Sequence, residues 1–166
     1  ISVVRRTTWL GYNQATWRRV AAWSNSVSAE MPSAGRTMLN QRRPADAAEQ
    51  YRTALKHAPD NWIALNNLAT LYHELKDPRA LSTAEEAFRR KPDSPDVMDT
   101  LGWILVSRGQ VARGTALLQK AVAKAPNAPG LRLHLAQALQ AGGKPAAARR
   151  ELETIVGLQG DKGDTP

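Results

Sequence analysis

The sequence repeats itself with a period of 33 to 34 residues, and this period constrains the fold more than any other feature. Proline recurs at that interval, at Pro59, Pro92 and Pro126. Alanine recurs at the same interval, at Ala54, Ala87 and Ala121. The segments around the prolines also resemble one another, as KHAPDNWIALNNLA, RRKPDSPDVMDTLG and AKAPNAPGLRLHLA. Three markers in one register predict a stack of structural repeats, each burying its apolar side against its neighbours.

The repeat resembles the tetratricopeptide repeat (TPR), a helix–turn–helix unit of 34 residues. In that family position 7 is large and apolar, positions 8, 20 and 27 are small, and a proline stands at position 32. This chain matches position 7 with Leu68, Leu101 and Leu135, and position 8 with Ala69, Gly102 and Ala136. The resemblance implies an all-α fold in which TPR helix–turn–helix repeats form a right-handed superhelical solenoid.

The small residues have a packing role in such a fold. Two helices approach to about 8–10 Å only where the facing side chains are small, so we predict that Gly102 and Ala121 are buried at helix–helix contacts. Proline cannot continue a helix and should end the second helix of each unit. Gly109 and Gly143 fall between the two helices of a unit, where a left-handed residue closes the first helix.

We assign four repeat units, at residues 28–60, 61–94, 95–128 and 129–157. The second unit lacks one residue near Asp77, and the first is degenerate in its first helix. The chain is therefore predicted to have a TPR domain of about three and a half repeats at 40–157. Residues 1–39 should be irregular or disordered with at most a degenerate helix, and residues 158–166 a flexible tail.

Residues 1–39 differ from the repeats in composition. They contain three of the five Trp, and five Lys or Arg against one acidic residue. Three interpretations remain open: an interfacial helix whose Trp and Arg bind an anionic membrane, a disordered leader, or out-of-frame translation. Because the first residue is Ile1 rather than Met, we expect the chain to be a piece of a longer product.

A narrower resemblance rests on three segments in order, NNLATLYHELKDPRAL, VMDTLGWILVSRGQVARGTALLQKAV and LRLHLAQAL. They are similar to the C-terminal repeats of the TPR-repeat lipoproteins of bacterial exopolysaccharide and PEP-CTERM protein-sorting systems. The resemblance implies a periplasmic or outer-membrane-associated scaffold for polymer export or assembly. The sequence lacks that family's signal and lipid-anchor Cys, so contact with a membrane would require a lost anchor. Without this resemblance the compartment is unknown.

Composition argues against several other functions. The chain has no Cys and only three His, in separate segments, so we predict neither a metal site nor a cofactor. The one close His–carboxylate pair, His73 with Glu74, consists of sequence neighbours, which do not face each other on a helix. We therefore predict no enzyme activity and no small-molecule substrate. The net charge of +8 leaves a basic nucleic-acid-binding or membrane-surface-binding repeat protein as the alternative function. Acidic residues interleave with the basic ones on the second helices, which argues against nucleic acid as the partner.

The favoured function is a non-catalytic scaffold that binds another protein or a peptide segment. Positions 2, 5, 9 and 12 of each first helix line the concave surface in this repeat family. With position 6 of the second unit added, we predict partner-binding residues at Asn66, Asn67, Thr70, His73, Asp99, Trp103 and Gln137.

The residue types on the concave surface suggest what it binds. Its positions contain no Lys or Arg, so we expect no clamp for a partner's C-terminal carboxylate, although Asn67 matches the Asn of such clamps. Asp96 and Asp99 favour a neutral or cationic partner segment. Trp103 is the single large aromatic residue of this surface and a candidate binding hot spot. Alternatively, Trp103 packs against the neighbouring helix.

Overall fold

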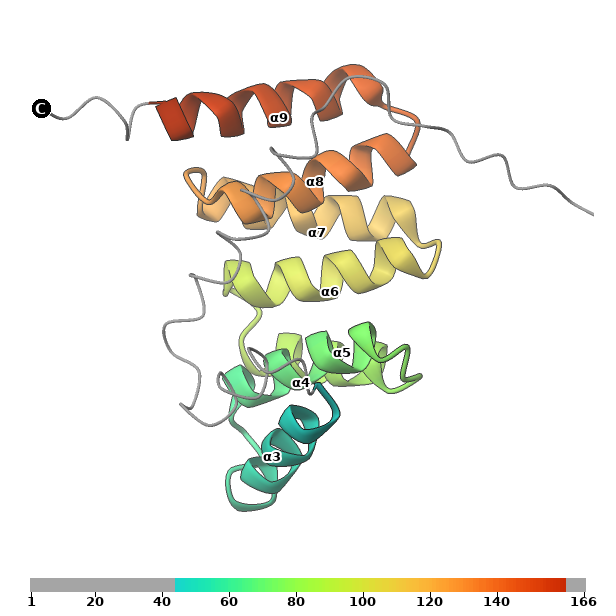
Figure 1. Ribbon diagram of the computed structural model, residues 1–166, viewed down its shortest axis with the longest axis vertical. Helices are drawn as coiled ribbons and strands as arrows, with labels where there is room; N and C mark the ends of the chain where they lie inside the picture. Colours follow the sequence, from blue (N-terminus) through green and yellow to red (C-terminus); the bar gives the residue numbers. More distant parts are fainter. Residues whose placement is uncertain (1–43, 161–166) are drawn as a thin grey trace, which may run out of the picture. The chain divides into compact units, whose positions relative to one another are not determined.

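The computed structural model describes residues 44–160. All elements in this part of the chain are α-helices, and it contains no strand (Figure 1). The helices are α3 (Pro44–His57), α4 (Trp62–Glu74), α5 (Ala80–Arg90), α6 (Pro95–Ser107), α7 (Val111–Lys124), α8 (Pro129–Ala141) and α9 (Pro145–Gly160). The predicted all-α fold class is confirmed.

The predictions for residues 1–39 lie outside the described residues, as do residues 40–43 and 161–166. At the other end, α9 continues to Gly160. Residues 158–160 were expected to begin the flexible tail but are helical. The helix extends this far because neither a proline nor a glycine with positive φ interrupts it.

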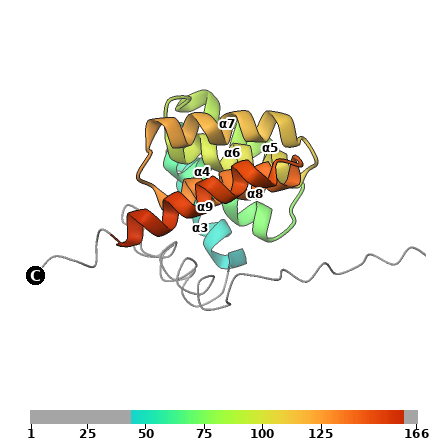
Figure 2. The same cartoon turned by 90° about the horizontal axis from the view of Figure 1, so that it is seen from above.

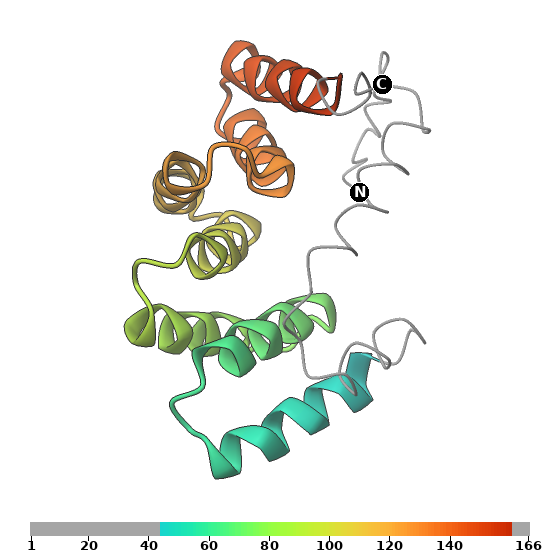
Figure 3. The ribbon, with the colours of Figure 1, turned by 90° about the vertical axis from the view of Figure 1, so that its left-hand side faces the viewer.

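The helices form pairs that follow the predicted units. In chain order the pairs are α4 with α5, α6 with α7 and α8 with α9, and α3 is the second helix of the first unit. Figures 1 and 3 show the pairs stacked from α3 to α9, and Figure 2 shows the same stack from above. The first helices also contact one another in succession, α4 with α6 and α6 with α8. We call the exposed side of these three helices the A-helix face; it corresponds to the concave surface expected from the sequence.

Proline and glycine lie at the helix ends, and the second helices α3, α5 and α7 end shortly before Pro59, Pro92 and Pro126, as the sequence predicts. Pro95 and Pro129 are the first residues of α6 and α8. An amide proton at this position makes no hydrogen bond within the helix, so proline, which lacks one, is tolerated there. Gly109 and Gly143 adopt positive φ angles of 81° and 71° between the helices of a unit. In the second unit, Lys76 takes the left-handed conformation instead, with φ of 57°. A side chain at that position is strained, whereas glycine is not.

The backbones of α6 and α7 nearly touch at two glycines. A Cβ atom placed on Gly114 would lie 2.4 Å from the carbonyl oxygen of Gly102. One placed on Gly102 would lie 2.9 Å from Cγ of Leu118. Because carbon atoms do not approach so closely, the geometry requires glycine at both positions. Gly102 and Ala121 are both buried, as predicted from their places in the repeat.

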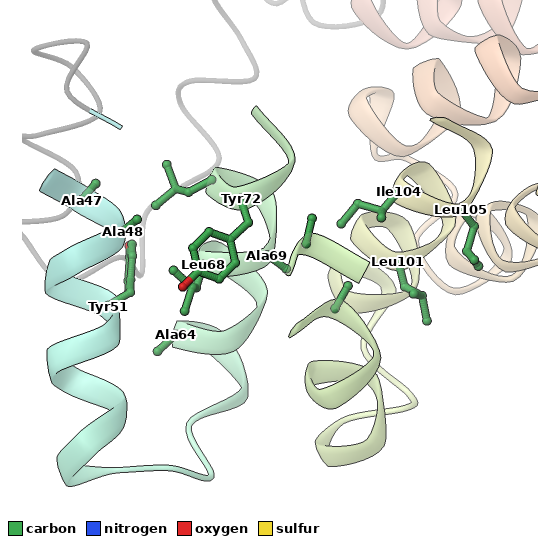
Figure 4. Close-up of a cluster of buried hydrophobic side chains, with 13 residues drawn as sticks. Ala47, Ala48, Tyr51, Ala64, Leu68, Ala69, Tyr72, Leu101, Ile104 and Leu105 are labelled. Carbon is green, nitrogen blue, oxygen red and sulfur yellow. The ribbon is translucent and has the colours of Figure 1, made fainter. Parts of the chain in front are cut away.

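Three clusters of buried side chains form the core. The first joins α3, α4, α5 and α6, and includes Tyr51, Leu68 and Leu101 (Figure 4). The second joins α6, α7, α8 and α9, and a small third cluster lies between α4, α5 and α6. Phe88 on α5, the one Phe of the chain, packs against all three clusters.

The glycine contact gives a stability prediction. Gly114→Ala should lower the free energy of unfolding by about 1–3 kcal/mol, because its methyl group would push α6 away from α7. Gly157→Ala is the matched control, since nothing lies within 4 Å of a Cβ at that position of α9. The control should raise the free energy of unfolding by about 0.5–1 kcal/mol through helix propensity. Urea denaturation of both variants is the measurement, and equal stabilisation in both would contradict the described contact.

Candidate partner-binding surface

The seven predicted binding residues all lie on the first helices α4, α6 and α8, but their surroundings differ. Thr70 is exposed. The other six are partly buried: Asn66, Asn67, His73, Asp99, Trp103 and Gln137. The contacts of each side chain decide which of them are available to a partner.

Asp99 of α6 is paired with His134 of α8. The Nδ1 atom of His134 lies 2.7 Å from Oδ2 and 2.9 Å from Oδ1 of Asp99. The prediction that Asp99 favours a neutral or cationic partner segment did not include this histidine. It considered only Lys and Arg at four positions of each first helix, whereas His134 stands at position 6. Position 6 was considered in the second unit, for Asn67, so the same position in the fourth unit carried a usable signal.

Trp103 stacks on the same histidine. The ring centroids of Trp103 and His134 are 4.9 Å apart and their planes differ by 10°. Trp103 also packs against the second hydrophobic cluster. It therefore contacts the neighbouring first helix, which was the alternative interpretation from the sequence, and it remains partly exposed. Its role in partner binding stays a prediction.

The environment shifts both pKa values of the Asp99–His134 pair. Burial raises the pKa of Asp99, and the hydrogen bond to His134 offsets part of that effect. Burial alone would lower the pKa of His134, but the hydrogen bond to Asp99 and its negative charge raise it above the usual value. His134 consequently keeps its proton to a higher pH than a solvent-exposed histidine would.

The two asparagines of α4 have different roles. The side-chain amide of Asn67 donates a hydrogen bond to the hydroxyl of Tyr51, at 3.3 Å, and thereby links α4 to α3. Asn66 has a buried Oδ1 atom with no hydrogen-bond partner in the described part of the chain. Its backbone carbonyl accepts from the Thr70 hydroxyl at 3.1 Å. Asn67 is thus engaged within the fold, and Thr70 is the most accessible of this group.

His73 lies near two basic residues that the sequence analysis did not assign to the surface. Burial lowers the pKa of His73, and the positive charges of Arg108 and His134 lower it further. Arg108 follows the last residue of α6, and its Nη2 atom donates to the carbonyl oxygen of Pro78 at 3.0 Å. It was missed because it lies just beyond the helix positions that were examined.

The second helices carry ion pairs on their exposed sides. Arg90 pairs with Glu86 of its own helix and with Asp60 of the preceding unit, and Arg149 pairs with Glu153. Among the residues described, no group of three His, Asp or Glu is placed to hold a metal ion. None of the seven helices has the length and apolar character needed to cross a membrane.

Two family models described as tetratricopeptide repeat match the sequence, at residues 33–95 and 105–162. Together they span most of the chain, and they include α3 to α5 and α7 to α9 in full. The chain therefore belongs to the tetratricopeptide repeat family.

Among individual proteins, the chain is similar to cellulose synthase operon protein C of Komagataeibacter sucrofermentans. The two are 33% identical over 120 residues, which cover 68% of this chain and 9% of that protein. The chain thus spans less than a tenth of the length of this relative. The corresponding protein of Komagataeibacter xylinus is 32% identical over 120 residues, with the same coverage.

Solved structures share the fold. PilW, described as a widely conserved type IV pilus biogenesis factor, superposes with a TM-score of 0.69 at 22% identity, covering 89% of this chain and 64% of that one. MamA from Desulfovibrio magneticus RS-1 superposes with a TM-score of 0.67 at 20% identity, covering 79% and 74%. At these identities the likeness shows the fold alone.

The Asp99–His134 pair predicts a pH dependence of stability. His134 has a folded-state pKa above its usual 6.5, so the stability that it adds is present below pH 6.5 and is lost as the pH rises through the folded-state pKa. The raised pKa of Asp99 acts in the same direction. His134→Phe keeps a ring beside Trp103 but removes the ion pair, and should cost about 1–3 kcal/mol at pH 6.

This cost should be smaller at pH 8.5, as measured by urea denaturation at both pH values. Asp99→Asn is the control, because it leaves the histidine in place and removes the negative charge; its cost should decline with pH in the same way. A cost of His134→Phe that does not depend on pH would show that the pair does not titrate as described.

Proposed function

We propose that this chain is a non-catalytic scaffold module that binds another protein through the A-helix face, within a bacterial polysaccharide export system. The observation that carries the proposal is a TPR stack whose three first helices present one continuous side, with Thr70 exposed and Trp103 partly exposed. Extended surfaces of this kind are how solenoid repeats bind partners. The similarity to cellulose synthase operon protein C supports the assignment to polysaccharide systems.

The contacts within the structure favour binding over catalysis. Asp99 and His134 form the one His–carboxylate contact among the described residues. That pair joins two helices, and Trp103 covers a face of the imidazole. A catalytic histidine would need a nucleophile or a substrate group within hydrogen-bond reach of its second nitrogen. His73 and Glu74, the pair noted in the sequence, make no ion pair with each other in the described structure.

The alternative partners receive less support. Nucleic acid or an anionic membrane would contact the arginines of the second helices. Several of these arginines already pair with acidic residues, as Arg90 does with Glu86 and Arg149 does with Glu153. A periplasmic or outer-membrane-associated location is part of the proposal, and it rests on the family resemblance alone. A role in PEP-CTERM protein sorting stays a prediction of the same resemblance.

A deletion and complementation experiment in the source bacterium tests this function. Deletion of the gene should lower the amount of secreted polysaccharide, and the unchanged gene should restore it. The double variant Thr70→Arg, Gln137→Arg places two bulky charged side chains on the A-helix face and should fail to restore secretion, with partner affinity reduced roughly tenfold or more. Its melting temperature should stay close to that of the unchanged protein.

The matched control is Arg149→Glu, Arg150→Glu, which changes two exposed residues of α9, a helix that is not part of the A-helix face. This control should restore secretion fully. Normal secretion after deletion would exclude the proposed role. A large, salt-dependent loss of nucleic-acid binding in the control variant would support the alternative partner instead.

A further inference from the structure

We propose that the part of the A-helix face formed by α6 and α8 binds an uncharged, β-linked polysaccharide, with one sugar ring stacked on Trp103 and its hydroxyl groups hydrogen-bonded by Gln137 and His134. The three side chains come from two successive repeat units, since Trp103 lies on α6 and the other two lie on α8. This inference rests on the assignment to a polysaccharide system in the proposed function, and it adds the polymer itself as a second ligand beside the protein partner.

Contacts within the chain hold the ring of Trp103 in one orientation. The imidazole of His134 stacks on it with ring centroids 4.9 Å apart and planes that differ by 10°. Asp99 in turn holds that imidazole through Nδ1, at 2.7 and 2.9 Å. Packing against the second hydrophobic cluster restrains the indole further. Because these contacts leave Trp103 partly exposed, it offers a ligand an aromatic surface whose orientation is already fixed.

Two side chains of α8 have unused hydrogen-bonding groups beside this ring. Gln137 follows His134 by three residues and therefore lies on the same side of the helix. Its amide makes no hydrogen bond within residues 44–160, and neither does Nε2 of His134, whose other nitrogen is bound by Asp99. An amide side chain has both donors and an acceptor. It therefore matches a sugar hydroxyl, which also donates and accepts.

The charges of this region favour an uncharged ligand. Among the concave positions of α6 and α8, the charged residues are Asp96 and Asp99, and none is Lys or Arg. His134 balances Asp99, so the region has no excess of positive charge that would attract an acidic polymer. A cation on Trp103 would share the indole with an imidazole whose raised pKa keeps it protonated to a higher pH than usual. Neither an anion nor a cation therefore has an advantage over a neutral ligand.

The shape of the sugar unit determines which polymer fits this surface. In a β-linked glucose chain the ring substituents are equatorial, so each ring presents C–H groups on both faces and hydroxyl groups around its rim. Such a face can pack flat on an indole while the rim reaches neighbouring polar side chains. An α-linked chain curls, and its successive rings do not lie in one plane. We therefore expect the site to distinguish the two linkages.

NMR titration of the whole chain, followed at the backbone amide resonances of α6 and α8, tests the inference. The probes are cellohexaose, which is β-linked, and maltohexaose, which has the same composition but is α-linked. Cellohexaose should bind with a Kd of about 1 mM or lower, and at least about fivefold more tightly than maltohexaose. Equal binding of the two sugars would overturn the inference, and so would the absence of any change with cellohexaose.

Two substitutions of the same kind test the place of the site. Trp103→Phe keeps an apolar ring against the second cluster but reduces the stacking surface, and should weaken cellohexaose binding about threefold or more. Trp62→Phe is the matched control, because Trp62 is also a partly buried residue at a first helix and packs against the third cluster. It should change the affinity less than about twofold. Equal losses in both variants would overturn the site.

A third substitution tests the hydrogen bonds separately from the stacking. Gln137→Leu keeps a side chain of similar size and removes the amide, so it should weaken cellohexaose binding about threefold or more with the melting temperature unchanged. An unchanged affinity would show that Gln137 does not bind the sugar. This variant leaves Trp103 and its contacts with the core in place, so its outcome does not depend on how well the tryptophan variants fold.

Capped hexaproline distinguishes the polysaccharide from a protein segment, because it is a peptide of uncharged rings that can also stack on an indole. If hexaproline binds more tightly than cellohexaose and loses affinity in Trp103→Phe, a proline-rich protein segment replaces the polysaccharide and the inference is overturned.

The inference and the proposed function can fail separately. If cellohexaose does not bind but the variant Thr70→Arg, Gln137→Arg still fails to restore secretion, the polysaccharide ligand is wrong and the scaffold function stands. If cellohexaose binds as described but secretion does not depend on the chain, the binding site stands and the proposed function is wrong.

Discussion

The near contact of α6 and α7 at Gly102 and Gly114 determines how the rest of the stack is arranged. With Gly102 held against α7, the neighbouring residues of α6 must point to either side of that contact. Leu101 enters the first hydrophobic cluster, and Trp103 packs against the second. The two glycines therefore set the direction in which Trp103 meets His134, and with it the geometry of the A-helix face between α6 and α8.

The sequence predicts the parts of the structure that depend on position within one repeat. Gly102 and Ala121 are buried, and Gly109 and Gly143 adopt positive φ, because the repeat register assigns each a backbone role. Contacts between repeats are harder to predict. Asp99 and His134 are 35 residues apart on helices of different units, and their pairing depends on how far one unit rotates against the next. Arg108 and the different roles of Asn66 and Asn67 escaped prediction for the same reason, since side-chain contacts rather than position decide them.

The two sides of the stack use charge differently. On the second helices, Arg90 with Asp60 and Lys124 with Asp93 connect successive units through exposed side chains, and such pairs typically contribute about 0–1 kcal/mol each. The Asp99–His134 pair is less exposed, with 13% and 34% of the side-chain surfaces accessible. It also orients the ring on which Trp103 stacks. The A-helix face is therefore ordered between α6 and α8, which would reduce the entropy lost on binding a partner at that face.

Phe88 contacts all three hydrophobic clusters, and this position has a consequence for how the chain unfolds. In a solenoid each unit interacts only with its neighbours, so terminal units can fray independently when the interfaces between units are weak. A single ring shared by the clusters on both sides of α5 and α6 strengthens the interface at the middle of the stack. Unfolding of the helices on either side would expose part of the Phe88 ring. We therefore expect the described helices to unfold as one cooperative unit rather than progressively from either end of the stack.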